Sequence, residues 1–242
     1  MARIGIIGSA GRMGQALAAA IADAGHVQSG GIDQGGDPAA LALASDVLID
    51  FSAPAALEAN CEAAIAAGVP LLVGTTGLEE RHHWLIDAAA VSIPVLQTGN
   101  TSLGVTLLAH LVREAAQRLG PEWDIEIVET HHRNKIDAPS GTALLLGEAA
   151  ASGRGEALRD IELRARDGVT GARDPGTIGF ASLRGGTVAG DHAVHFLADN
   201  ERLTLAHVAE NRAIFARGAV RAGEWLLGRA PGRYTMPHVL DL

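Results

Sequence analysis

The sequence predicts an α/β protein in which a doubly wound parallel-sheet domain is followed by a mixed α/β domain. Over the first hundred residues, short apolar strands alternate with helical patterns, which predicts parallel strands joined by right-handed crossovers. A glycine-rich turn follows the first strand directly. The pattern changes near Asn100, and from Ile178 to Val208 strands follow one another with few helices between them, which is typical of a mixed or antiparallel sheet.

Five short segments are expected to form the strands of the first part. They are expected at Ala2–Ile7, Val27–Ile32, Val47–Phe51, Leu71–Val73 and Ile93–Leu96. Met13, Leu17 and Ile21 recur at a spacing of four and predict a helix with one apolar face. A second helix is expected from Pro54 to Ala67, because proline is tolerated in a first turn and Gly68 follows the last residue.

The second part mixes strands and helices in another order. The expected elements are a helix at Leu103–Leu119, a strand at Ile125–Thr130, a helix from Ser140, strands at Ile178–Leu183, Ala193–Leu197 and Leu203–Val208, and a helix at Ala209–Leu227. The segment Gly153–Gly176 is polar and rich in glycine, and we expect a long loop there. The tail from Tyr234 is expected to be strand or loop.

Composition excludes several classes of partner. With 48% hydrophobic but only 3% aromatic residues, the core is expected to consist of Ala, Leu, Val and Ile. The formal net charge of −9 argues against nucleic acid and against an anionic membrane surface. Cys61 is the only cysteine and cannot form an internal disulfide. No apolar run suits a signal peptide or a membrane span, so we expect a cytoplasmic protein.

The run Gly8–Gly14 resembles a dinucleotide-binding turn. Glycines allow backbone amides to approach a pyrophosphate, whose charge the start of the next helix favours. Asp33 ends the second expected strand, where an acid accepts from both ribose hydroxyls of the adenosine. The loops Gly74–Gly77 and Gly99–Ser102 follow later strands at the same sheet edge. This set favours a Rossmann-like cofactor domain over ordinary turns with an incidental acid.

A dense cluster of charged and proton-carrying groups lies between Glu126 and Ala143. It holds His131, His132, Arg133, Lys135 and Asp137, and it closes on Pro-Ser-Gly-Thr. Adjacent histidines on a strand face opposite ways, which disfavours a metal site. The Pro-Ser-Gly-Thr turn suits either simple helix capping or the docking of a carboxylate. Next to a nicotinamide, the cluster suits hydride transfer with proton addition to a small anionic substrate.

The chain resembles the dihydrodipicolinate reductase family over nearly its whole length. The resemblance is carried by Glu126–Ala143, the opening glycine loop, Gly74–Gly77, Asn100 with Ser102, Ala216–Ala219, Tyr234 with Met236, and Val239–Leu242. It implies reduction of 4-hydroxy-tetrahydrodipicolinate, a dicarboxylate of the diaminopimelate route to lysine, by NADH or NADPH. It also implies a homotetramer, a dinucleotide-binding domain at 1–102 and 211–242, and a substrate-binding and oligomerisation domain at 103–210.

The resemblance also implies roles for single residues. His131 and Lys135 match the catalytic histidine and lysine, and His132, Gly141 and Thr142 match substrate-binding residues. The residues that match the family's cofactor loops are Gly8, Ser9, Ala10, Gly11, Arg12, Met13, Asp33, Gly74, Thr75, Thr76, Gly99, Asn100, Thr101 and Ser102.

Two residues depart from the pattern, and two rival functions remain open. Thr101 stands where many relatives have Phe. Gln34 stands where some relatives have Arg, a residue that would bind the 2′-phosphate of NADPH. We therefore expect NADH to be used at least as well as NADPH. One rival is another small nicotinamide dehydrogenase, such as an aspartate dehydrogenase. The other is a nucleotide-sensing protein without chemistry, which would need neither His131 nor Lys135.

Overall fold

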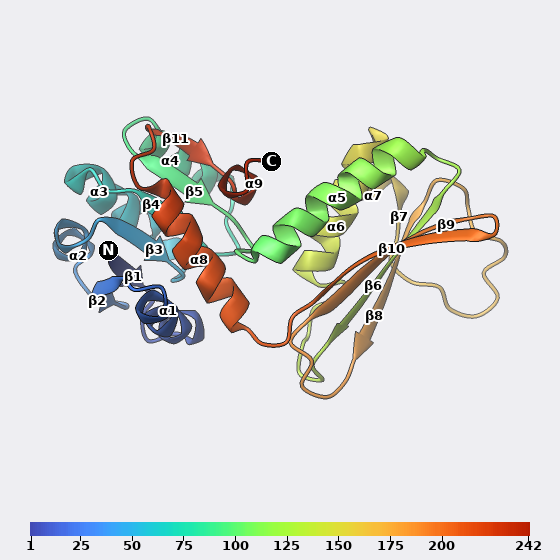
Figure 1. The fold of residues 1–242 in the computed structure, drawn as a ribbon, viewed down its shortest axis with the longest axis horizontal. Helices are drawn as coiled ribbons and strands as arrows, with labels where there is room; N and C mark the ends of the chain where they lie inside the picture. The colour runs from blue at the N-terminus through green and yellow to red at the C-terminus, as the bar shows by residue number, and fades with distance from the viewer. The chain divides into compact units, whose positions relative to one another are not determined.

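The computed structural model describes residues 1–242, which form two compact units (Figure 1). The first unit contains Met1–Leu103 together with Ala213–Leu242, and the second contains Gly104–Arg212. Each unit is built on its own sheet. None of the helices combines the length and apolarity that crossing a membrane requires.

The first unit holds a six-stranded parallel sheet in the order β11-β5-β4-β3-β1-β2. Its strands are β1 (Arg3–Ile7), β2 (Val27–Ile32), β3 (Val47–Asp50), β4 (Leu71–Val73), β5 (Pro94–Gln97) and β11 (Gly232–Tyr234). Its helices are α1 (Arg12–Asp23), α2 (Pro38–Ala44), the short 3₁₀ helix η1 (Pro54–Ala56), α3 (Leu57–Ala67), α4 (Glu80–Ala90), α8 (Ala213–Leu226) and α9 (Met236–Val239). The expected parallel-sheet fold is confirmed.

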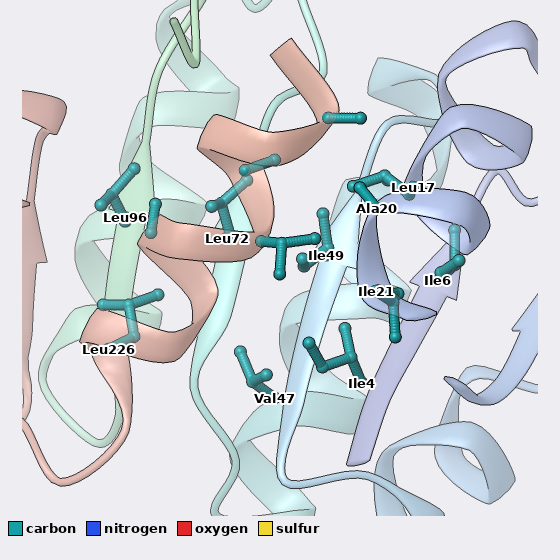
Figure 2. Packing of buried hydrophobic residues seen from close by; sticks show 14 of the residues in the cluster. Ile4, Ile6, Leu17, Ala20, Ile21, Val47, Ile49, Leu72, Leu96 and Leu226 are labelled. Carbon is teal, nitrogen blue, oxygen red and sulfur yellow. The ribbon is translucent and has the colours of Figure 1, made fainter. Parts of the chain in front are cut away.

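Both faces of this sheet are covered by helices. On one face, Leu17 and Ile21 of α1 and Leu226 of α8 pack against strand residues such as Ile4 and Ile49 (Figure 2). On the other face, α2, α3 and α4 contribute to a second apolar cluster. Burial on both faces explains why the central strands β1, β3 and β4 are mostly apolar in the sequence. Truncating one of these buried side chains to alanine costs about 2–5 kcal/mol.

The second unit holds a mixed five-stranded sheet in the order β10-β9-β6-β8-β7. Its strands are β6 (Asp124–His131), β7 (Glu162–Leu163), β8 (Ile178–Arg184), β9 (Asp191–Ala198) and β10 (Glu201–Val208), and its helices are α5 (Leu103–Leu119), α6 (Gly141–Arg154) and α7 (Leu158–Ile161). β6 pairs in parallel with β8 and antiparallel with β9. Side chains from α5 and α6 form the apolar core with one face of this sheet.

Three expectations about elements were wrong. The segment 153–176 is not all loop, because α6 runs to Arg154 and is followed by α7 and β7. The buried side chain of Leu158 anchors α7. This helix has only four residues, which is too short for a periodic pattern in the sequence. The last long helix begins at Ala213 rather than Ala209, whose backbone N–H donates to the carbonyl of Gly190. The tail contains α9, where Thr235 and His238 form a capping box.

Candidate functional site

The inward face of β6 changes from apolar to charged along its length. Side chains alternate between the two faces of a strand, so Ile125, Ile127, Glu129 and His131 share one face. The two isoleucines are buried in the core, and the next two residues continue the same line. Glu129 is 1% exposed and His131 is 8% exposed. A buried carboxylate and a buried imidazole therefore lie at the end of this strand.

Glu129 is surrounded by hydrogen-bond donors. Its Oε2 lies 2.5 Å from Nδ1 of His131, and its two oxygens accept from Arg184 at 2.7 and 2.8 Å. The backbone N–H of Ser140 donates to Oε1 at 3.2 Å. Burial alone would raise the pKa of Glu129, but the hydrogen bonds from Arg184, His131 and Ser182 outweigh it and lower the pKa to about 2. The carboxylate is therefore ionised at neutral pH, and Nδ1 of His131 carries a proton toward it.

A second buried histidine lies beside the first. The rings of His131 and His192 meet edge to face with centroids 5.1 Å apart. Nε2 of His192 lies 2.9 Å from the hydroxyl oxygen of Ser140, whereas its Nδ1 is buried without a hydrogen-bond partner. Burial, followed by repulsion from His131, lowers the pKa of His192 to about 4. His192 is therefore neutral at pH 7.

The helix α6 starts against this cluster. Ser140 is its N-cap, and its hydroxyl oxygen accepts from the backbone N–H of Ala143 at 3.1 Å. At Gly141, an added Cβ would meet no atom within 4 Å, so the approach to the backbone there is open. The first turn of a 14-residue helix carries a partial positive charge that attracts anions. The arrangement therefore suits a carboxylate at Gly141 and Thr142.

Two cations on loops of the second unit bind residues of the predicted charged cluster. Nζ of Lys135 donates to both carboxylate oxygens of Asp137, at 2.7 and 2.8 Å. The bond from Lys135 lowers the pKa of Asp137. Nη2 of Arg212 lies 2.8 Å from Nε2 of His132, which acts as the acceptor because guanidinium only donates. All five residues expected in this part of the chain lie in the second unit, namely His131, His132, Lys135, Gly141 and Thr142.

Sequence reasoning missed Glu129, Arg184, His192 and Arg212. For Glu129 a signal existed, because it stands two residues before His131 on an expected strand and must share its face. Arg184 is opposite His131 in the register of β6 with β8, and His192 is opposite Glu129 in the register of β6 with β9. Such pairings depend on the tertiary fold and leave no local pattern.

The residues expected to bind a dinucleotide gather in the first unit. Gly8 has a φ of +86°, and a Cβ there would lie 2.6 Å from the carbonyl oxygen of Phe51. Gly8 therefore allows the sharp turn from β1 into α1. Asp33 holds this turn by accepting from the Ser9 hydroxyl at 2.8 Å and from the backbone N–H of Ala10 at 3.0 Å. Arg12 begins α1 and is exposed, and Met13 packs partly against the core.

A groove of about 600 Å³ opens beside this turn. Its lining includes Gly8, Gly11, Asp33, Gln34 and Asn60. The volume, the backbone-lined turn and the acid at the end of β2 fit the adenosine part of a nicotinamide dinucleotide. The residues present therefore suit such a cofactor.

The remaining expected cofactor residues follow β4 and β5. Gly74 and Thr75 both bond to Asp50, through its carbonyl oxygen and its carboxylate. Oδ1 of Asn100 accepts from the backbone N–H of Ser102 at 2.9 Å. Thr101 is 2% exposed, and its hydroxyl donates to the carbonyl oxygen of Phe215 at 2.7 Å. Thr76 and Gly99 lie in the same two loops.

Comparisons with known proteins agree over both units. The family described as "Dihydrodipicolinate reductase, N-terminus" matches residues 2–101, and "Dihydrodipicolinate reductase, C-terminus" matches residues 104–240. The chain is 56% identical to a 4-hydroxy-tetrahydrodipicolinate reductase of Zymomonas mobilis, covering 99% of this chain and 97% of that one. It is 48% identical to the protein of the same description from Bradyrhizobium diazoefficiens, with the same two coverages.

A solved structure shares the fold. It is the dipicolinate-bound dihydrodipicolinate reductase from Paenisporosarcina sp. TG-14, which superposes with a TM-score of 0.75 at 20% identity. The match covers 97% of both chains.

Proposed function

The chain belongs to the dihydrodipicolinate reductase family, and we propose that His131, Lys135 and the start of α6 carry out the family's reaction. It is an NAD(P)H-dependent oxidoreductase of the diaminopimelate route to lysine, and it reduces 4-hydroxy-tetrahydrodipicolinate. The observation that carries this conclusion is identity near 50% to such reductases along 99% of the chain. Oxidation of NADH, followed by its absorbance with freshly made substrate, tests it directly.

The substrate is proposed to bind in the second unit. It carries two carboxylates, and the cluster offers a helix start at Gly141 and Thr142 together with cationic groups on Lys135 and Arg212. The chain as a whole has a net charge of −9 and repels an anion, so a local positive site is needed. One carboxylate is proposed to dock on the first turn of α6, within reach of Lys135. His132, held by Arg212, is proposed to contact the substrate as well.

The reaction consumes one hydride and one proton and releases one water. When bound, the reduced nicotinamide supplies the hydride to the substrate ring. We propose that His131 transfers the proton through Nε2, because its Nδ1 faces Glu129. Lys135 is proposed to hold the substrate and to stabilise negative charge. Removing either side chain is expected to lower kcat and to leave the binding of NADH almost unchanged.

For the cofactor, we propose that NADH is used at least as well as NADPH. Asp33 is suited to ribose hydroxyls but repels a 2′-phosphate, and Gln34 and Gly35 beside it carry no charge. Arg12 is the nearest cation in the glycine loop that would compensate in part. The pyrophosphate is proposed to lie on Gly8–Met13. The nicotinamide is proposed to contact the loops Gly74–Thr76 and Gly99–Ser102, where Thr101 contributes backbone because its hydroxyl bonds to Phe215.

The assembly is proposed to be a homotetramer. The face of the second sheet that points away from α5 and α6 carries a row of small and apolar side chains across its strands, namely Val128, Ala181, Leu183, Ala193, Ala206 and Val208. Leu183 and Val208 are 54% and 63% exposed, and contact with a second copy would bury them. Ala193→Glu is expected to reduce the mass measured by light scattering. The cytoplasm is the proposed location, where the free, buried thiol of Cys61 stays reduced.

A further inference from the structure

The inward face of β6 places a buried carboxylate behind the proposed catalytic histidine. We propose that Glu129 is a positioning residue, which fixes the tautomer and the ring orientation of His131 and couples that ring to the start of α6. This inference rests on the proposed function, because it assumes that His131 acts in the reduction. It adds Glu129, which was not among the site residues expected from the sequence.

The hydrogen bonds of Glu129 indicate that it does more than fill space in the core. Ile125 and Ile127 fill the two preceding inward positions, so a third apolar residue would continue the core at no electrostatic cost. Burying a carboxylate without partners is expensive. Here Arg184 neutralises the charge through two bonds, and the remaining acceptor capacity goes to His131 and to the backbone of Ser140.

Gly190 lies beside Nε2, the other nitrogen of the His131 ring. A Cβ at Gly190 would lie 2.9 Å from Nε2 of His131 and 3.5 Å from Cε1 of His192. Glycine at this position leaves space beside Nε2 that any side chain would occupy. One ring nitrogen is therefore held by a carboxylate while space is kept beside the other, which is the arrangement that a proton-transferring histidine requires.

Glu129 also joins two parts of the proposed site. Its Oε1 accepts from Ser140, the residue that caps α6, and its Oε2 lies against His131. The side chain of Ser140 in turn contacts His192, whose ring packs against His131. Moving Glu129 would therefore change the position of the imidazole relative to the helix start where the carboxylate is proposed to dock.

The principal test is a double-mutant cycle on kcat with Glu129→Gln and His131→Ala. Glutamine keeps the shape of Glu129 and removes its charge. We expect Glu129→Gln to lower kcat by about 10²-fold, the lower part of the range for a positioned acid–base group, with the KM for NADH unchanged. In the His131→Ala background, the same change is expected to cost less than about threefold further, because the two residues act as one unit.

Glu126→Gln is the matched control. Glu126 stands on the same strand and is bound by Arg166 and Arg173, but it lies on the opposite face of β6. It is expected to keep the parent kcat. An equal loss of kcat in Glu126→Gln and Glu129→Gln would overturn the proposal by showing a general effect of breaking ion pairs on this strand.

The remaining outcomes separate this inference from the proposed function. If His131→Ala loses kcat while Glu129→Gln does not, or if the two losses multiply, the positioning role is wrong and the function stands. If His131→Ala keeps the parent kcat, both the role of His131 and the role of Glu129 are wrong. Nitrogen-15 NMR of the unmutated enzyme is a second test, and it does not depend on whether a variant folds. A proton on Nδ1 of neutral His131 is expected, and a proton on Nε2 instead overturns the proposal.

Discussion

Nζ of Lys135 lies 2.7 Å from Oδ1 of Asp137, so the lysine proposed to meet the substrate already has an anionic partner. The side chain of Asp137 is 55% exposed and that of Lys135 is 20% exposed. A dicarboxylate that approaches Lys135 therefore competes with a solvated carboxylate two residues away.

Asp137→Asn is expected to tighten the binding of pyridine-2,6-dicarboxylate, a planar mimic of the substrate. An exposed ion pair is worth about 0–1 kcal/mol, so the dissociation constant should fall by up to about fivefold. Calorimetry measures this constant, and Asp160→Asn on α7 serves as a charge-matched control. Binding that became tenfold weaker would show that Asp137 holds Lys135 in place for the ligand.

Thr142→Val tests the docking of a carboxylate on α6. Valine keeps the shape of the side chain and removes the hydroxyl. We expect the KM for the substrate to rise by the equivalent of about 1–3 kcal/mol, the loss of a hydrogen bond to a charged group. Binding of pyridine-2,6-dicarboxylate should weaken in parallel, whereas Thr142→Ser should retain most of both. Unchanged affinity in Thr142→Val would mean that the carboxylate lies elsewhere.

The choice of cofactor should depend on the end of β2. The unmutated enzyme is expected to show a kcat/KM with NADH at least equal to that with NADPH, because Asp33 repels a 2′-phosphate. Gln34→Arg should raise kcat/KM for NADPH, since arginine binds phosphate through paired donors. Gln28→Arg is the control, because Gln28 lies on β2 itself and outside the groove lining. A clear preference of the parent for NADPH would contradict the proposal.

His192 should make folding sensitive to acid. Burial lowers its pKa from the ordinary 6.5 to about 4, so the unfolded chain binds the proton more readily than the folded one. Its stabilising contribution is complete above pH 6.5 and declines as the pH falls toward 4, by roughly 3 kcal/mol in total. In urea unfolding between pH 7 and 4, His192→Gln should flatten this decline. The control is His195→Gln, a change on the outer face of β9. If the stability of parent and His192→Gln declined with the same slope against pH, His192 would not be the source of the acid sensitivity.

The central strands of the first sheet could be predicted because β1, β3 and β4 are almost entirely buried and therefore apolar. The expected strands Val27–Ile32 and Leu71–Val73 coincide with β2 and β4, and the predicted helix Leu103–Leu119 coincides with α5. β11 could not be predicted, because its three residues include Arg233 and Tyr234 and it becomes a strand only by pairing with β5.

Part of the candidate site could likewise be predicted from the sequence, and part of it could not. His131, Lys135 and the start of α6 are contiguous in the sequence, so their chemistry was visible as a cluster. The carboxylate behind His131 was visible only through strand alternation. The arginine that neutralises this carboxylate comes from β8, and its place depends on a register that no local pattern encodes.

The most direct test of the proposed function and site is the steady-state reduction of 4-hydroxy-tetrahydrodipicolinate by the parent and by Lys135→Ala, with NADH binding measured on both. We expect turnover by the parent, a kcat lower by about 10²–10⁴-fold in Lys135→Ala, and nearly equal dissociation constants for NADH. A variant with the parent's kcat would contradict the assignment of the site, and a parent that binds NADH without turnover would contradict the function.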